Sequence, residues 1–208
     1  AVLAAPGETV RLRVSTASDC SDATLTASVR IETPPGWGDA PVRTDDLPPR
    51  GHRDRWVEVS VPADAEPGHY PVRAALQLTG DVPPAWRQTV EDVCIITIGE
   101  PAVDLVTLTV EPVDVVVARG NTTRVSATVA SGARGDLALE AHLISPWGTW
   151  EWIGPASQGA VLPARSSVEV GFEVSPPPWL TPGTWWALIR IGCAGRLLYS
   201  PAVAVTVT

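Results

Sequence analysis

The segment SPWGTWEWIG (145–154) has the residue types most suited to binding chemistry, because it places three tryptophans around one acidic residue. Tryptophan rings carry a large apolar surface and a polar N–H group. In an extended strand, Trp150 and Trp152 share one face at a separation of about 7 Å. Glu151 then points to the opposite face. We expect the two rings to be covered by their own domain, by a neighbouring domain or by a carbohydrate ligand.

A further candidate is Trp186, in the segment PGTWWALIRIG (182–192). Alternation in a strand places Trp185 on the apolar face with Ala187 and Ile189, and Trp186 on the other face. The candidate contacts for a partner protein or a carbohydrate are Trp150, Trp152, Trp186 and Glu151. A protein partner is favoured over a sugar, because few polar side chains lie near these rings in the sequence.

Acidic and histidine residues form no catalytic pattern in the sequence. Glycoside hydrolysis needs two carboxylates on either side of one bond, whereas Asp45 and Asp46 point to opposite sides of an extended chain and fall in a Pro-rich stretch that predicts a solvated loop. His52, His69 and His142 show no metal-ligand spacing. We predict no catalytic residue, no metal site and no cofactor in this chain.

Composition excludes two classes of function. The 208 residues carry a net charge of −8, and all 15 basic residues are arginines without a basic tract. Nucleic-acid binding is therefore not expected, because it needs clustered basic side chains. No apolar run reaches the length of a membrane span. Residues favoured by GC-rich codons indicate a bacterial source. Cys20 and Cys94 are either a disulfide in an exported protein or free thiols.

Two halves of the sequence repeat one pattern. EVSVPADAEPGHYPVRA (58–74) aligns with EVSPPPWLTPGTWWALI (173–189), and GETVRLRVS (7–15) aligns with GNTTRVSAT (120–128). PPGWG (34–38) aligns with SPWG (145–148), which pairs Trp37 with Trp147 and suggests a shared structural role. The repeat predicts two domains, residues 1–100 and 101–208.

Local patterns are all those of β-strands. Short alternating segments bounded by Gly, Pro, Asp or Ser recur about seven times in each half, which predicts two tandem immunoglobulin-like (fibronectin type III-like) β-sandwiches. VDLVTLTVEP (103–112) opens the second half with a strand that has no counterpart in the first half. We expect that counterpart to lie upstream of Ala1.

The motifs GETV (7–10), PPGW (34–37) and VPADAEPGHY (61–70) resemble the alpha-galactosidase-associated (NPCBM-associated) β-sandwich domain found beside bacterial glycoside hydrolase catalytic domains. In that family the domain is non-catalytic. The second half resembles it more loosely, and its segments 145–152, 181–191 and 195–203 are similar to the C-terminal region of bacterial family 38 alpha-mannosidases. The resemblance implies an active site with a metal held by Asp and His, which this chain lacks.

The sequence therefore predicts a non-catalytic C-terminal accessory region of a bacterial glycoside hydrolase, with an alpha-mannosidase favoured over an alpha-galactosidase as the parent enzyme. Its expected partner is an upstream catalytic domain of the same polypeptide. Two alternatives stay open. One is a lectin-like carbohydrate-binding module, and the other is an exported array of sandwiches that binds other proteins.

Overall fold

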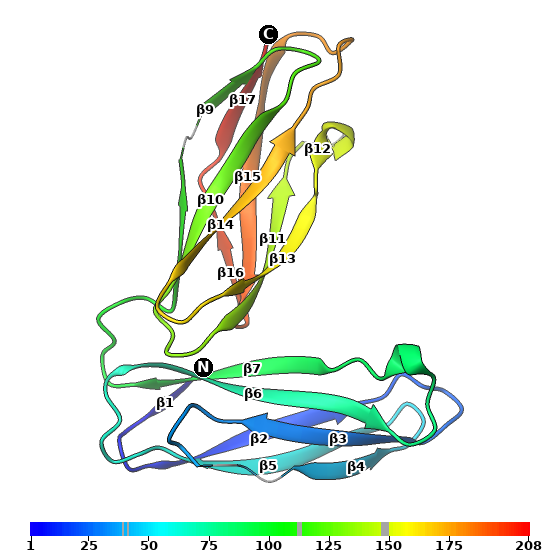
Figure 1. The fold of residues 1–208 in the computed structure, drawn as a ribbon, viewed down its shortest axis with the longest axis vertical. Helices are drawn as coiled ribbons and strands as arrows, with labels where there is room; N and C mark the ends of the chain where they lie inside the picture. The colour runs from blue at the N-terminus through cyan, green and yellow to red at the C-terminus, as the bar shows by residue number, and fades with distance from the viewer. Residues whose placement is uncertain (39, 41, 112–113, 147–149) are drawn as a thin grey trace. The chain divides into compact units, whose positions relative to one another are not determined.

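The computed structural model describes residues 1–208 except 39, 41, 112–113 and 147–149. The chain forms two compact units, Ala1–Ala102 and Val103–Thr208 (Figure 1). Each unit is an immunoglobulin-like β-sandwich, as the alternating patterns predict. Among the described residues, no helix is both long enough and apolar enough to cross a membrane.

The first unit packs a five-stranded sheet, in the order β1-β7-β6-β3-β4, against a two-stranded sheet of β2 and β5. All strand pairs are antiparallel except β1 with β7. The elements of this unit are β1 (Val2–Ala4), β2 (Thr9–Ala17), β3 (Leu25–Glu32), β4 (Arg43–Leu47), β5 (His52–Ser60), β6 (Gly68–Thr79), the 3-10 helix η1 (Pro84–Trp86) and β7 (Val90–Ile98).

The second unit packs the strands β13-β11-β15-β17-β9 against a four-stranded sheet in the order β12-β14-β10-β8, and β16 also pairs with β15. The pair of β17 and β9 is parallel. The elements are β8 (Val106–Val110), β9 (Asp114–Val117), β10 (Thr123–Ser131), β11 (Leu137–Ile144), the 3-10 helix η2 (Trp150–Trp152), β12 (Ile153–Gly154), β13 (Ser157–Leu162), β14 (Ser167–Val174), β15 (Gly183–Cys193), β16 (Arg196–Tyr199) and β17 (Val203–Val207).

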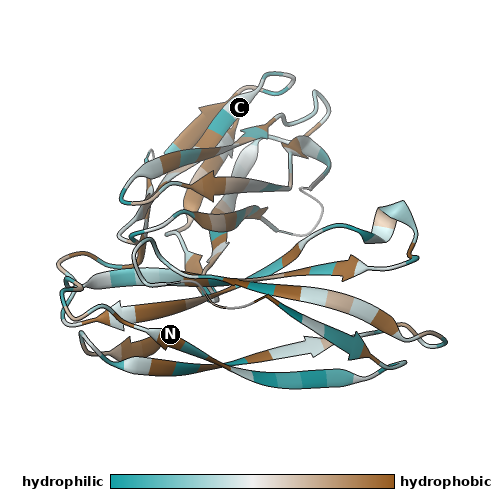
Figure 2. Cartoon of the chain, turned by 60° about the horizontal axis from the view of Figure 1, so that its bottom comes forward, coloured by the Kyte–Doolittle hydropathy of each residue, from teal (hydrophilic) through white to brown (hydrophobic). Residues whose placement is uncertain are grey.

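The core of each unit follows from alternation along its strands. In β11 the residues Leu139, Ala141 and Leu143 are buried, while Glu140 between them is exposed. Figure 2 shows the same change between hydrophobic and hydrophilic residues along strands of both units. Because successive side chains point to opposite faces, each strand gives one apolar face to the interior and one polar face to solvent.

The two units share one pairing pattern. Arg11 on β2 lies opposite Glu58 on β5, and Arg124 on β10 lies opposite Glu173 on β14. These four residues are the ones that the sequence alignment matches. The order β1-β7-β6-β3-β4 likewise corresponds to β9-β17-β15-β11-β13. The strand order and the register of the two units therefore agree with each other.

A turn of unusual conformation also occurs in both units. Arg50 and Arg165 have φ of 50° and 51°, in the left-handed region that non-glycine residues rarely adopt. The backbone N–H of Arg50 donates to the carbonyl of Cys20, and that of Arg165 donates to the carbonyl of Ala133. An equivalent hydrogen bond therefore holds Arg50, shortly before β5, and Arg165, shortly before β14.

The units differ at one sheet edge. β8 pairs with β10 in the second unit, whereas the corresponding edge of β2 has no strand partner among the described residues. The sequence comparison predicted this difference but missed β1, which takes the place that β9 has in the second unit.

Replacement of Ile96 by alanine is expected to lower the free energy of unfolding of the first unit by about 2 to 5 kcal/mol, because the side chain is fully buried between the two sheets. The matched control is Leu3→Ala on the adjacent β1, which removes an exposed side chain and is expected to change stability by no more than about 0.5 kcal/mol. Urea denaturation measures both variants. Equal losses would contradict this assignment of the core.

Candidate functional site

The structure corrects the expected conformation of residues 150–152. They form the 3-10 helix η2 instead of a strand, so positions 150 and 152 do not share a strand face. Trp152 is only 7% exposed, and its ring meets the ring of Trp185 edge to face at a centroid distance of 5.7 Å. Trp152 is therefore part of the core and does not offer its ring to a partner. Glu151 is exposed on the same turn.

The first unit contains an equivalent aromatic pair. The ring of Trp37 lies 4.8 Å from that of Tyr70, and Tyr70 is the residue that aligns with Trp185. The Tyr70 hydroxyl also donates a 2.8 Å hydrogen bond to the carbonyl of Glu66. The ring of Trp152 thus packs against Trp185 as the ring of Trp37 packs against Tyr70. The predicted counterpart of Trp37, Trp147, lies outside the described residues, and only the backbone of Trp150 is described.

Trp186 lies on the outer face of its sheet, as the alternation of β15 predicts. Its neighbours Trp185 and Ala187 point inward, and Trp186 itself is 45% exposed. On β17 the residue directly opposite is Ala204, whose small side chain leaves the indole uncovered on that side. Asp114 on β9 lies opposite Ala204 in turn, and it is exposed. An aromatic ring and a carboxylate therefore share one outer face, two strands apart.

Further residues extend this outer face, which we call the Trp186 face. Val116 on β9 is 68% exposed, and the hydroxyls of Thr184 and Thr206 lie 3.2 Å apart between the strands. The sequence analysis missed Asp114, Val116 and Thr206, because their nearness to Trp186 depends on the pairing of β15 with β17 and of β17 with β9. Ring, carboxylate and hydroxyls together can stack on and hydrogen-bond to a polar ligand.

The polar side chains close to the tryptophans in the sequence behave differently from one another. The side-chain amide of Gln158 donates a 2.8 Å hydrogen bond to the carbonyl of Gly171 and is committed to the fold. Arg190 lies opposite His142 in the ladder between β15 and β11, and His142 in turn contacts Glu140 at 2.9 Å. None of these contacts brings a second carboxylate beside Glu151.

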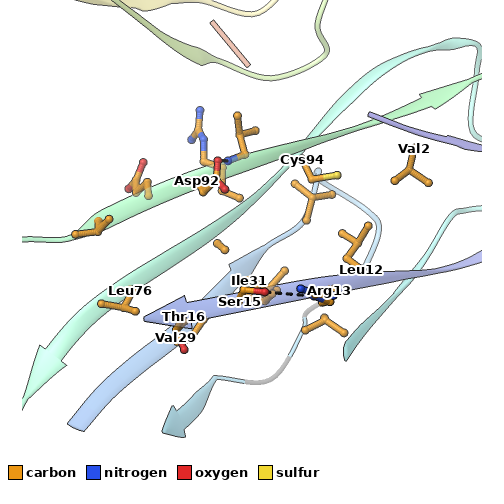
Figure 3. Close-up of a pocket in the computed structure, with 18 of the residues that line it drawn as sticks. Val2, Leu12, Arg13, Ser15, Thr16, Val29, Ile31, Leu76, Asp92 and Cys94 are labelled. Atoms are coloured by element: carbon orange, nitrogen blue, oxygen red, sulfur yellow. Dashed lines mark hydrogen bonds between the residues drawn. The ribbon is translucent and has the colours of Figure 1, made fainter. Parts of the chain in front are cut away.

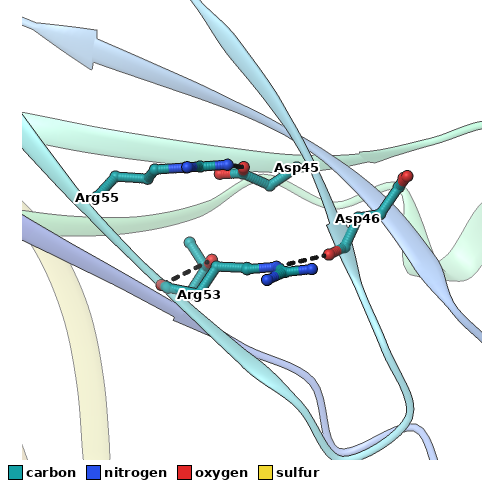
Figure 4. A network of polar contacts seen from close by, with 5 residues as sticks. Asp45, Asp46, Arg53 and Arg55 are labelled. Carbon is teal, nitrogen blue, oxygen red and sulfur yellow. Dashed lines mark hydrogen bonds and ion pairs between the residues drawn. The ribbon is translucent and has the colours of Figure 1, made fainter.

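Asp45 was expected in a solvated loop and is instead buried on β4. Its carboxylate is 4% exposed and accepts hydrogen bonds from Nε and Nη2 of Arg55 at 3.0 and 2.6 Å. Figure 4 shows the guanidinium of Arg55 meeting the carboxylate of Asp45 end to end, while Asp46 points away. The hydrogen bond to Asp45 raises the pKa of Arg55. A carboxylate held this way accepts from a permanent cation and is poorly placed to act as an acid.

Asp46 and Arg53 complete the contacts beside this ion pair. The Asp46 carboxylate accepts a 2.8 Å hydrogen bond from the hydroxyl of Thr26, and its carbonyl accepts one from Nε of Arg53 (Figure 4). Since Asp45 and Asp46 point to different surroundings, they cannot act on one bond, in line with the expected alternation.

Histidine and cysteine residues are likewise engaged in the fold. His69 is buried on β6, and its Nδ1 lies 3.0 Å from the hydroxyl of Thr97. Cys20, Cys94 and Cys193 are all free thiols. Within the part of the chain that the structure describes, no group of three or more His, Cys, Asp or Glu side chains could hold a metal ion.

The first unit has its own exposed aromatic residue, which the sequence analysis did not single out. Trp56 on β5 is 55% exposed, and the Arg11 guanidinium lies 5.1 Å from its ring centroid. Its outward position next to the buried Val57 follows from alternation along β5, so the strand period was a usable signal. The contact is a cation–π interaction within the sheet.

Comparison with known proteins finds a family match within the first unit. Residues 4–79 match the family model described as the NPCBM-associated, NEW3 domain of alpha-galactosidase, which is a little more than a third of the chain. These residues include β2 through β6. No curated protein matches the chain.

Three solved structures are similar at low levels. A family 123 glycoside hydrolase from Clostridium perfringens is 7% identical over 50% of this chain and 27% of its own length, with a TM-score of 0.39. A protein of unknown function from Porphyromonas gingivalis W83 is 15% identical over 99% and 93%, and CBD12 from CALX1.2 is 15% identical over 96% and 78%, both with TM-scores of 0.32. The chain thus spans about a quarter of that hydrolase.

Trp152→Ala is expected to destabilise the second unit by about 3 to 5 kcal/mol, since it empties the space beside Trp185. The control Trp186→Ala removes a half-exposed ring of the same size and is expected to change the free energy of unfolding by about 0.5 kcal/mol or less. Guanidinium denaturation followed by far-UV circular dichroism distinguishes the two. A neutral Trp152→Ala would contradict the placement of this ring in the core.

The pH dependence of stability is expected to include a contribution from Asp54. A 2.6 Å hydrogen bond from the Ser15 hydroxyl is the main cause that lowers the pKa of Asp54 below its ordinary value of 3.8, and Arg13 adds to it. The folded state therefore binds the proton less readily than the unfolded state, so the stabilisation is complete above 3.8 and is lost as the pH falls through the lower pKa.

Denaturation measured on both sides of this pH should show a smaller loss on acidification for Asp54→Asn than for the unmodified chain. Asp19→Asn, at an exposed loop position, serves as the control and should follow the unmodified chain. Parallel pH curves for Asp54→Asn and the unmodified chain would refute the contribution of Asp54.

Proposed function

We propose that this chain is a non-catalytic accessory region of a bacterial glycoside hydrolase, which supports a catalytic domain of the same polypeptide. The observation that carries the proposal is the match of residues 4–79 to the NEW3 domain of alpha-galactosidase. The proposal extends this role to the second unit, whose strand order and register follow those of the first.

The engagement of the acidic side chains supports a non-catalytic role. Asp45 is neutralised by Arg55, Asp54 is held by Ser15 and Arg13, and Glu140 contacts His142. A retaining or inverting glycosidase needs two free carboxylates that face one another across the scissile bond. The carboxylates named here instead connect neighbouring strands, which is a structural use.

For the parent enzyme we propose an alpha-mannosidase, with an alpha-galactosidase as the second choice. The similarity of SPWGTWEW (145–152), TPGTWWALIRI (181–191) and GRLLYSPAV (195–203) to the C-terminal region of family 38 alpha-mannosidases favours the first. The description of the matching family model favours the second. In either case the proposed partner is the catalytic domain that precedes this region in the same polypeptide.

The lectin-like module remains the second candidate, because the Trp186 face combines a half-exposed indole with a nearby carboxylate and hydroxyls. Stacking on an aromatic face and hydrogen bonds to carboxylate are suited to a sugar ring. This alternative predicts saturable binding of mannose oligosaccharides that Trp186→Ala abolishes without loss of stability.

The pure chain is expected to release no nitrophenol from p-nitrophenyl α-mannoside or α-galactoside, whereas the full-length enzyme does. Removal of these residues from the full-length enzyme is expected to lower the melting temperature of its catalytic domain, since a packed neighbour stabilises what it covers. The measurements are a chromogenic assay and differential scanning calorimetry. Turnover by the pure chain would contradict the proposal, and so would an unchanged melting temperature of the catalytic domain.

A further inference from the structure

The free edge of β2 opens into a groove within the first unit. The groove has a volume of about 520 Å³ and lies between β2 and β7, with residues of β3 and β6 at its base. Figure 3 shows Leu12, Ser15 and Thr16 along the β2 side, and Asp92 and Cys94 along the β7 side. Val2 of β1 closes one end. The groove is therefore a gap between the two sheets of one sandwich.

The second unit contains a strand at the corresponding place. β8 runs antiparallel to β10, with Ala127 opposite Val110 and Ser131 opposite Val106. The alignment matches Ala127 and Ser131 with Val14 and Ser18. Val106 and Val110 of β8 are both buried. The second unit thus shows which kind of segment fits against this edge: a short strand with apolar side chains at alternate positions.

The residues that line the groove in the first unit are less buried than their counterparts in the second unit. Four side chains on β2, β6 and β7 that pack against the core and line the groove are only partly buried: Val14, Ala74, Leu76 and Cys94. Their counterparts by alignment and strand pairing are all buried: Ala127, Ile189, Ile191 and Val203. An apolar surface that is covered in the unit with the extra strand is therefore accessible in the unit without it.

Backbone groups on β2 are also available. The N–H of Ser18 donates to Gly51, and the carbonyl of Glu8 accepts from Val61, so even-numbered residues of β2 direct their backbone groups toward β5. The odd-numbered residues then direct theirs toward the groove, and among them Ser15 and Ala17 match Thr128 and Ala130 of β10, which lie opposite β8. In the second unit the corresponding backbone groups are hydrogen-bonded to the extra strand. The N–H of Gly132, which follows β10, donates to the carbonyl of Leu105, which precedes β8.

We propose that the edge of β2 and this groove bind an extended polypeptide segment from outside residues 1–208, with apolar side chains at alternate positions, as an added antiparallel strand. The ladder to Ser15 and Ala17 supplies hydrogen bonds, and Val14, Leu76 and Cys94 receive the apolar side chains. Arginine and acidic residues both line the groove, so its recognition rests on the backbone and on apolar contact more than on net charge.

The test uses the complete chain and a fluorescent peptide with the sequence of residues 103–111, VDLVTLTVE, because β8 has the required pattern. Fluorescence anisotropy is expected to show saturable binding. A peptide carrying Thr107→Pro and Thr109→Pro keeps the apolar side chains but loses two N–H donors that face the partner strand, and it should bind at least about tenfold more weakly.

On the protein side, Ala17→Pro removes one N–H that faces the groove and none that bonds to β5, and proline is tolerated on such an edge. This variant should lose at least about tenfold in affinity for the peptide, whereas Ala17→Ser, which keeps the N–H, should bind normally. Urea denaturation confirms that both variants fold. The binding site is located by alkylation of Cys94, which the peptide should slow and the diproline peptide should not.

Absence of saturable binding overturns the proposal. Binding that survives both Ala17→Pro and the diproline peptide overturns the added strand. Sedimentation of the chain alone tests a second copy as the occupant: a dimer that Ala17→Pro dissociates overturns the outside source and assigns the edge to self-association. These outcomes are independent of glycosidase assays, so they do not depend on the proposed accessory role.

Discussion

The burial of the apolar inner faces of two sheets against each other is the constraint on which both units depend. A strand gives one apolar face, and a sandwich is stable only when each face is covered by the opposite sheet. The second unit meets this demand with four strands, β12, β14, β10 and β8, on one side. Among its described residues, the first unit has β2 and β5 there, opposite five strands. The partly buried state of Val14 and Leu76 follows from this inequality.

The same constraint determines where charge lies. Since the inner faces are apolar, ionisable side chains are driven outward, where they pair across strands, as Asp54 does with Ser15 and Arg13. Asp45 is an exception, because its burial is compensated by two hydrogen bonds from Arg55. These acids connect strands and are not gathered around a cavity. Aromatic surface and free backbone groups are then the means of recognition that the described residues offer.

Periodicity in the sequence predicted the all-β class, the outward position of Trp186 and the strand at β8, because each of these depends on residues close together in the chain. Prediction failed for features that depend on contacts between segments far apart in the sequence. The burial of Asp45 depends on Arg55, the patch around Trp186 depends on the pairing of β17 with β9, and the position of Trp152 depends on contact with Trp185. The 3-10 turn of η2 replaced an expected strand, since tertiary packing of Trp152 outweighed local alternation.

The aromatic pairs show how a shared frame can differ locally. Tyr70 and Trp185 occupy matching positions, yet their partners, Trp37 and Trp152, do not align in the sequence. A space in the core can be filled from whichever loop reaches it, because packing requires volume and contact and does not require a particular chain position. The strand ladder, in contrast, requires a defined register. The pairs Arg11 with Glu58 and Arg124 with Glu173 show that both units have the same one. Differences between the units therefore collect in loops, outer faces and sheet edges, and a difference in function between them has to arise from those same places.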